Sequence, residues 1–227
     1  MSRYLVYKVV HMKRKTHQGR IYDKEKTKQK LIKAVGSILI KEGFQNIKVN
    51  RVEAVSGVSK KLIYRYFGGL EGLIQDYLEQ RDFWNIQIKQ MEGSSYDTTI
   101  PLEKDEIFSI LADDFRFFEK SPEMQKIILW GISEKNKALK AIANNRERFG
   151  APVFKKADLT FKDSDIDFRA VSGTIVAAIY YLILHGKMLG TTVCEIDITK
   201  KEGKERYLNT FKKIIELCYE QAAGNKK

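Results

Sequence analysis

The chain has 227 residues, 43% of them apolar, with 15 glycines and 3 prolines. This length predicts either one large domain or a small domain joined to a larger one, and the composition excludes a disordered or fibrous chain. Only two cysteines are present, Cys194 and Cys218, which excludes a disulfide framework and a four-cysteine zinc site. We therefore expect a folded protein of a reducing, cytoplasmic compartment.

Positive charge is concentrated near the N-terminus. Residues 1–80 contain 17 Lys and Arg against 7 Asp and Glu, a net +10 out of the +12 of the whole chain. Such a field attracts polyanions, of which nucleic acid and an anionic membrane are the leading candidates. The longest apolar stretch, residues 175–184, is shorter than the ~20 residues of a membrane-spanning helix. The sequence therefore favours nucleic acid as the partner and predicts no membrane association.

Apolar residues recur at helical spacing through most of the chain, which predicts an all-α protein. The spacing is missing from residues 1–22, where we expect a basic, flexible arm; Met12, which opens a more basic run, is an alternative start. Residues 191–198 are typical of a short strand or an extended loop, and residues 93–101, rich in Gly, Ser and Thr, are the best boundary candidate. The predicted helices cover residues 24–42, 50–55, 60–67, 70–91, 103–120, 122–131, 133–149, 165–189 and 201–223.

Three of these helices, near the basic end, have the arrangement of a helix-turn-helix. Asn50 and Glu53 have the spacing of a capping box for the second helix, and Ser59 is a candidate cap for the third. The third helix places Lys60 and Tyr64 on one exposed stripe and Lys61 and Arg65 on a neighbouring one. Such a helix fits the major groove of DNA, with cations and hydroxyls on its phosphates. On periodicity alone, an ordinary solvated face is an equal alternative.

The block VSKKLIYRYF at 58–67, followed by GGLEGLI at 68–74, resembles the DNA-binding domain of tetracycline-repressor-like (TetR family) regulators. The resemblance covers about residues 24–77. It implies a homodimer that places two recognition helices in successive major grooves of a double-stranded, near-palindromic operator, and a C-terminal domain that binds a small molecule. Carried over by position, it implies DNA contacts from Asn50, Arg51, Ser59, Lys60, Lys61, Tyr64 and Tyr66, and the exposed face of the third helix adds Arg65.

The resemblance divides the chain into the arm at 1–22, a helix-turn-helix domain at 23–69 and an effector-binding and dimerisation domain at 70–227. Two positions depart from the family pattern. Val49 stands where a threonine often caps the second helix, so we expect the cap to shift to Asn50. Leu70 stands where a lysine commonly contacts phosphate, so we expect Lys61, Arg65 and the arm to replace that contact.

The C-terminal part offers two candidate surfaces. Its aromatic residues favour an apolar or aromatic effector, although ordinary core is the alternative for each of them; the candidates are Trp84, Phe108, Phe115, Phe118, Trp130, Tyr180, Tyr181 and His185. The last two helices combine small and apolar residues, which suits a dimer interface, with a monomeric core as the alternative. The interface candidates are Ile175, Ile179, Leu182, Phe211, Ile214, Ile215 and Cys218.

No catalytic or metal-ligand motif is present, so we expect neither an enzyme nor a cofactor nor a metal site. The sequence predicts a ligand-responsive DNA-binding transcriptional regulator, most simply a dimeric repressor released by a small, largely apolar or aromatic effector. Two alternatives stay open at this stage. One is a nonspecific basic DNA-binding protein, and the other is a helical enzyme that uses the C-terminal cavity.

Overall fold

This computed structural model describes residues 17–81 and 97–224. The N-terminal elements are α1 (His17–Glu42), a 3-10 turn η1 (Phe44–Asn46), α2 (Val49–Ser56), α3 (Lys61–Phe67) and α4 (Leu70–Arg81). The remaining helices are α6 (Lys104–Lys120), α7 (Pro122–Ser133), α8 (Lys137–Phe161), α9 (Phe168–Leu189) and α10 (Lys201–Gly224). Among the described residues, β pairing is limited to one isolated bridge, Val193 with Ile196. The all-α prediction is confirmed.

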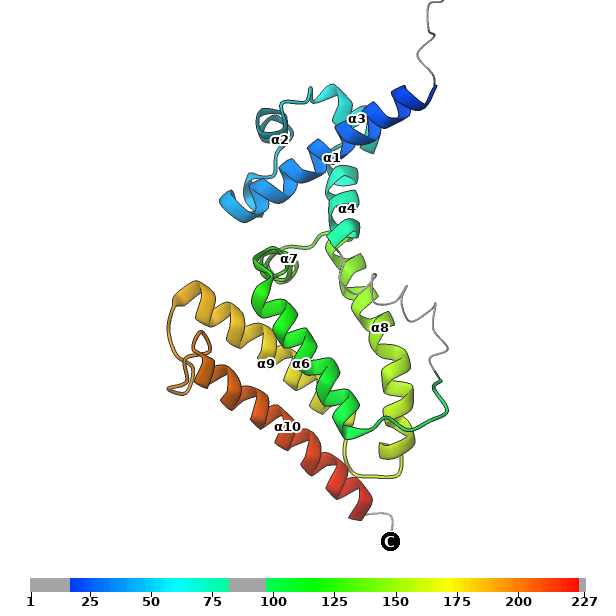
Figure 1. Cartoon of the computed structure of the whole chain (residues 1–227), viewed down its shortest axis with the longest axis vertical. Helices are drawn as coiled ribbons and strands as arrows, with labels where there is room; N and C mark the ends of the chain where they lie inside the picture. The colour runs from blue at the N-terminus through cyan, green and yellow to red at the C-terminus, as the bar shows by residue number, and fades with distance from the viewer. Residues whose placement is uncertain (1–16, 82–96, 225–227) are drawn as a thin grey trace, which may run out of the picture.

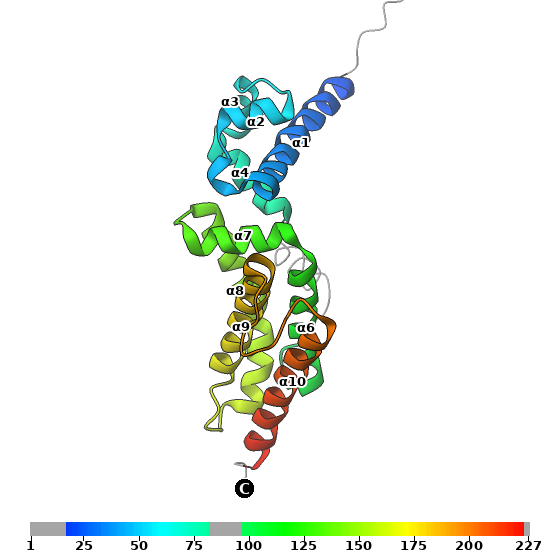
Figure 2. The same cartoon turned by 90° about the vertical axis from the view of Figure 1, so that its left-hand side faces the viewer.

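The molecule is elongated, with a small domain at one end and a large helical domain at the other (Figures 1 and 2). Helices α1, α2 and α3 form the small domain, and α4 runs from it toward the large one. The long helices α6, α8, α9 and α10 make up the large domain. Helix α7 lies crosswise between the two (Figure 2), where it packs on α1, α6, α8 and α9.

The small domain folds around the apolar stripe of α1. Leu31, Val35, Ile38 and Leu39 are all fully buried, as their spacing predicts for one face of a helix. Gly57 (φ 65°) and Gly68 (φ 75°) follow α2 and α3 in the left-handed conformation, which glycine adopts without steric cost. These two glycines allow the chain to turn sharply between three short helices.

The ends of these helices differ from the sequence prediction. Helix α1 begins at His17, within the predicted arm, so the arm prediction is wrong for residues 17–22; residues 1–16 lie outside the described part. The capping-box prediction is also wrong, because Lys48, with no side-chain capping bond, precedes α2 and Asn50 lies inside that helix. Lys60, and not Ser59, immediately precedes α3, again without a side-chain cap of its own.

The large domain confirms most predicted helices but corrects one. The helix predicted at 133–149 begins after Asn136, whose side chain accepts hydrogen bonds from the backbone N–H groups of Ala138 and Leu139 at 2.8 and 3.3 Å. It continues to Phe161 with Pro152 inside it. The predicted strand or loop at 191–198 is a tight turn closed by the bridge of Val193 and Ile196. The predicted helix at 70–91 is described as far as Arg81.

Helix α9 is long and apolar enough to cross a membrane by length and composition alone, which the shorter apolar stretch at 175–184 did not indicate. Its apolar face is buried within the large domain, where Ile175, Ile179 and Ile183 are at most 3% exposed. It packs on α6, α7 and α8. One third of its most apolar 18-residue window is buried, so α9 contributes one apolar face to the core of the large domain.

We predict that Gly72→Ala destabilises the small domain. A methyl group at Gly72 would overlap the carbonyl oxygen of Phe67, because α4 folds back sharply on the end of α3. Forcing the backbone apart costs about 1–3 kcal/mol of unfolding free energy, which urea unfolding measures. The control is Gly131→Ala on α7, where a methyl group meets nothing within 4 Å and a gain of about 0.5–1 kcal/mol is expected. Equal effects of the two substitutions would contradict the predicted clash.

Candidate nucleic-acid interface and ligand cavity

Helix α3 presents an exposed cationic and aromatic face. Lys60, Lys61, Tyr64 and Arg65 are all exposed, and the ring of Tyr64 is 58% exposed although it is large and partly apolar. The opposite face holds Ile63, which is fully buried. This division orients the polar side chains of α3 outward, as a helix that enters a DNA groove requires.

The start of α3 is held by side chains of α2. The carboxylate of Glu53 accepts the backbone N–H of Lys60 at 2.8 Å, and the amide oxygen of Asn50 accepts the Lys60 ammonium at 3.2 Å. Asn50 and Glu53, the two residues of the expected capping box, therefore bond to the start of α3 and not to the start of α2. A carboxylate at this position also stabilises the positive end of the α3 dipole.

Arg51 is engaged within the chain. Its guanidinium donates two hydrogen bonds to the Glu42 carboxylate, at 2.8 and 2.7 Å, and so ties α2 to the end of α1. The Arg51 hydrogen bond lowers the pKa of the Glu42 carboxyl, and the same bond raises the pKa of Arg51. This bidentate pairing gives Arg51 a role in holding the helices together. A DNA contact from Arg51 stays a prediction.

Two further exposed cations of the small domain were not singled out from the sequence, Lys24 and Lys48. Lys24 of α1 sits over the ring of Tyr66, 5.6 Å from its centre, and Arg65 approaches the same ring at 6.0 Å. Lys48 is exposed where the chain enters α2. The signal for Lys24 was the basic outer face of α1, but its closeness to Tyr66 depends on how α1 packs against α3.

Helix α7 meets the small domain through one carboxylate. The Glu123 carboxylate accepts hydrogen bonds from the Tyr77 hydroxyl at 2.6 Å and from the Arg81 guanidinium at 3.1 Å, both on α4. Gly36 of α1 faces this group, since a methyl group there would lie 3.0 Å from the Tyr77 ring and 3.2 Å from the Glu123 carboxylate. Helices α1, α4 and α7 therefore meet closely at this point.

A second contact joins α7 to the segment before α2. The rings of Phe44 in η1 and Trp130 in α7 are stacked, with centres 5.5 Å apart and planes 8° apart. The Trp130 indole N–H donates to the Glu134 carboxylate at 3.1 Å. Phe44 thereby links the helix-turn-helix to Trp130. Through its hydrogen bond Trp130 in turn contacts Glu134, a residue that lines the main cavity of the large domain.

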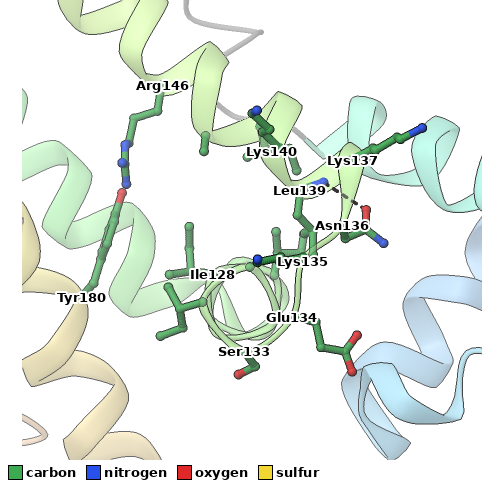
Figure 3. A pocket seen from close by; sticks show the side chains of 15 residues that line it. Ile128, Ser133, Glu134, Lys135, Asn136, Lys137, Leu139, Lys140, Arg146 and Tyr180 are labelled. Atoms are coloured by element: carbon green, nitrogen blue, oxygen red, sulfur yellow. Dashed lines mark hydrogen bonds between the residues drawn. The ribbon is translucent and has the colours of Figure 1, made fainter.

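That cavity, of about 790 Å³, lies between α7, the first half of α8 and Tyr180 of α9 (Figure 3). Its volume falls within the range of small-molecule sites. Apolar side chains from both helices line it, together with four cations and one carboxylate. The lining side chains include Ile127, Leu139, Ile142, Glu134, Lys135, Lys137, Lys140, Arg146 and Tyr180.

Most of the predicted effector residues do not line this cavity. Tyr180 lines it, whereas Phe115, Phe118 and Trp130 are at most 4% exposed and belong to the core. Tyr181 points outward and is 59% exposed. Phe108 lies under Lys212, His185 is half-buried beside Tyr181, and Trp84 lies outside the described residues. Aromatic character alone did not reveal which way each ring points.

A buried carboxylate lies near the cavity wall. Asp114 of α6 is 5% exposed, and its Oδ2 atom accepts no hydrogen bond within the described part of the chain. Burial raises the pKa of this carboxyl to about 7, and the charge of Arg146 opposes that rise. Burial, and then the charge of Asp114, raise the pKa of Tyr180. Asp114, Arg146 and Tyr180 therefore form one electrostatically coupled group.

Most of the predicted dimer residues are buried within the single chain. Ile175, Ile179, Leu182, Phe211, Ile215 and Cys218 are at most 8% exposed, so their apolar faces form the monomeric core. Of that set only Ile214, at 37%, is exposed. The apolar side chains that α9 and α10 expose are Tyr181, Met188, Leu189, Ile214 and Leu217. The spacing identified two amphipathic helices whose apolar faces pack inside the chain, and a dimer contact of these helices stays a prediction.

Among the described residues, no three His, Cys, Asp or Glu side chains gather closely enough to hold a metal ion. The two free cysteines belong to no such group of described residues: Cys218 is buried, and Cys194 lies in an exposed turn. The described side chains offer two candidate binding surfaces: a cationic face on α3 and a mixed apolar and cationic cavity.

No protein-family model and no curated protein matches the sequence. Solved structures do match. A TetR-family transcriptional regulator from Streptomyces coelicolor shares 17% identity with a TM-score of 0.58, over 91% of this chain and 98% of that one. The regulator FadR from Bacillus subtilis, solved with stearoyl-CoA, shares 12% with a TM-score of 0.57, over 84% and 97%.

A third structure, that of a putative TetR-family transcriptional regulator from Rhodococcus sp., shares 18% identity with a TM-score of 0.56, over 86% of this chain and 99% of that one. The likeness therefore spans both domains and nearly the whole length of each neighbour. The chain has the fold of TetR-family transcriptional regulators, as the motif at 58–74 indicated.

We predict that Asp114→Asn stabilises the protein at alkaline pH more than at acidic pH. The carboxyl has a pKa of about 7 when folded against 3.8 as its ordinary value. The folded chain thus binds this proton more tightly, so the free energy of unfolding of the wild type falls as pH rises from about 4 to about 7. Urea unfolding at pH 5 and pH 8 measures the difference.

The shift corresponds to at most about 4 kcal/mol between the two ends of this window. The matched control is Asp113→Asn, the exposed neighbour of Asp114, whose side chain is 67% exposed; its effect should be small and nearly independent of pH. If Asp114→Asn changed stability by the same amount at pH 5 and pH 8, the buried carboxyl would not be titrating as described.

Proposed function

We propose that this protein is a ligand-responsive, DNA-binding transcriptional regulator that works in the cytoplasm as a homodimer, and that it represses until a small effector releases it. The exposed face of α3 carries the proposal: Lys60, Lys61, Tyr64 and Arg65 point outward from the part of the chain that holds a net +10. The fold shared with TetR-family regulators supports it.

In this proposal α3 lies in the major groove. The lysines at its start and Tyr64 reach base edges or phosphates, because the N-terminal residues of a recognition helix are nearest to the bases. Glu53 and Asn50 hold Lys60 in place, and Lys24, Lys48 and Arg65 add cations along the phosphate backbone. These side chains supply both a positioning and a reading surface.

The dimer is proposed to form through exposed apolar residues of the last two helices. Tyr181 and Met188 lie on α9 and Ile214 and Leu217 on α10, all between 37% and 59% exposed. Burying such side chains between two copies contributes about 25 cal/mol for each Å² of apolar surface. The small exposed residues of α9, Gly173 and Ala177, allow close approach of a facing helix. A symmetric pair of α3 helices then matches a near-palindromic operator.

Effector binding is proposed to act through α7. One end of this helix lines the cavity, and its other end carries Glu123, which bonds to Tyr77 and Arg81 of α4. Trp130, within the stretch of α7 that lines the cavity, stacks on Phe44 of η1. A ligand that favours a shifted α7 would thereby favour a different placement of α3, and operator and effector affinities must be coupled reciprocally. The FadR neighbour, solved with stearoyl-CoA, supports a ligand site in this fold.

We predict that the purified protein selects a near-palindromic motif from random DNA duplexes at near-physiological salt. Lys61→Ala and Tyr64→Ala should each lower affinity for that motif about tenfold, since a phosphate or base contact contributes on the order of 1–3 kcal/mol. Fluorescence anisotropy with the selected duplex measures the change. Lys201→Ala, an equally charged change on the exposed start of α10, should leave affinity within about twofold.

If the folded wild-type protein enriches no motif, the proposal of specific regulation is contradicted, and a nonspecific DNA-binding protein is the interpretation that remains. Salt dependence separates the two kinds of contact. Removing a phosphate-contacting residue should reduce the slope of log affinity against log salt concentration by about one. Removing a base-contacting residue should instead lower the preference for the selected motif over other sequences.

A further inference from the structure

The walls of the main cavity carry an unbalanced positive charge. Lys135, Lys137, Lys140 and Arg146 line it together with a single carboxylate, that of Glu134. Glu134 already accepts the indole N–H of Trp130. None of the three lysines makes an ion pair with an acidic side chain of residues 17–81 or 97–224. Arg146 pairs with the exposed Glu147 carboxylate at 3.3 Å, so the uncompensated cations around the otherwise apolar interior are the three lysines.

The cations and the apolar side chains occupy different parts of the wall. Ile127 of α7 and Leu139 and Ile142 of α8 are at most 6% exposed and form its floor. Lys140 and Arg146 extend from α8 above it (Figure 3). Apolar floor and cationic rim together match a molecule that has an apolar body and a negative group at one end.

Arg146 is the cation best placed to receive the negative group. Figure 3 shows its side chain reaching across the cavity wall toward the Tyr180 hydroxyl, and its guanidinium lies 6.0 Å from the centre of the Tyr180 ring. A guanidinium presents paired N–H donors that fit the oxygens of a carboxylate or phosphate. The Tyr180 hydroxyl adds another possible donor at the same place.

We infer that the cavity binds an anionic amphiphile, with its carboxylate or phosphate at Arg146, Lys140 adding positive charge elsewhere on the wall, and its apolar body against Ile127, Leu139 and Ile142. The inference names the effector class of the proposed regulator, so its regulatory meaning rests on that proposal. It adds a negative group to the largely apolar or aromatic effector that the sequence favoured. The cavity of about 790 Å³ accommodates a chain of medium length beside the head group.

The test uses the full-length protein without DNA and four probes that share one apolar chain: decanoate, decyl phosphate, decanol and decylamine. Titration calorimetry measures affinity. We expect decanoate or decyl phosphate to bind at least about tenfold more tightly than decanol, and decylamine to bind most weakly. The tighter of the two anions identifies the head group. Acetate and inorganic phosphate, which lack the chain, should bind far more weakly than either.

Arg146→Gln and, separately, Lys140→Gln should lower the affinity of the anionic probe about tenfold or more and leave that of decanol within about twofold. Lys140 is exposed, so its substitution keeps the test valid if the Arg146 variant folds poorly. The control is Lys155→Gln, an exposed lysine of the same helix outside the cavity, which should change neither affinity.

Equal binding of decanol and decanoate, or tighter binding of decylamine, would overturn the inference, as would unchanged anion affinity in both variants. These outcomes are distinct from a failure of the proposed function. A protein that selects an operator but ignores anionic amphiphiles is a regulator with another effector. A protein that binds them through Arg146 but selects no DNA has the ligand site without the regulatory role.

Discussion

The Glu123 carboxylate joins α7 of the large domain to α4, the helix that leaves the small domain. It lies in the first turn of α7, accepts hydrogen bonds from Tyr77 and Arg81 of α4, and fits there because Gly36 of α1 has no side chain. A part-buried carboxylate with two donors is costly to leave unpaired, so α7 and α4 are held in register. The position of α3 relative to the large domain depends on this register, since α4 packs directly on α3 and α1.

The same helix brings the two candidate sites into communication. From Glu123 it continues into the stretch 127–133 that lines the cavity, within which Trp130 stacks on Phe44. Packed interiors transmit displacements because they contain few voids that could absorb them. A helix with one end in a cavity and the other in a polar joint is therefore a suitable element for coupling a ligand to a DNA-binding surface.

Charge is used differently at the two sites. On α3 the cations are exposed and act on a polyanion outside the protein, where salt screens them strongly. In the cavity Arg146 and Tyr180 lie beside the buried carboxyl of Asp114, where the lower polarity of the surroundings strengthens each interaction. A negative ligand group at Arg146 would also act on Asp114, so ligand and proton binding are expected to influence each other there.

Local regularities of the sequence account for most of the fold. The spacing of Leu31, Val35, Ile38 and Leu39 predicted a buried face of α1, and all four are buried. Turn glycines marked the ends of α2 and α3, and the block at 58–74 indicated the fold that the solved neighbours share. Helix boundaries were predicted less accurately where a side chain of another helix contributes to them, as Glu53 of α2 does at the start of α3.

The sequence by itself determined the helices, their apolar faces and the exposed cations of α3, because each of these depends on spacing within a single helix. Only the tertiary structure decided what the faces meet: it buried Ile179 and Ile215 inside one chain, turned Tyr181 outward and paired Arg51 with Glu42. It also placed four cations around the cavity. These features depend on the rotation and packing of helices that are distant in sequence, and periodicity within one helix contains no information about its neighbours.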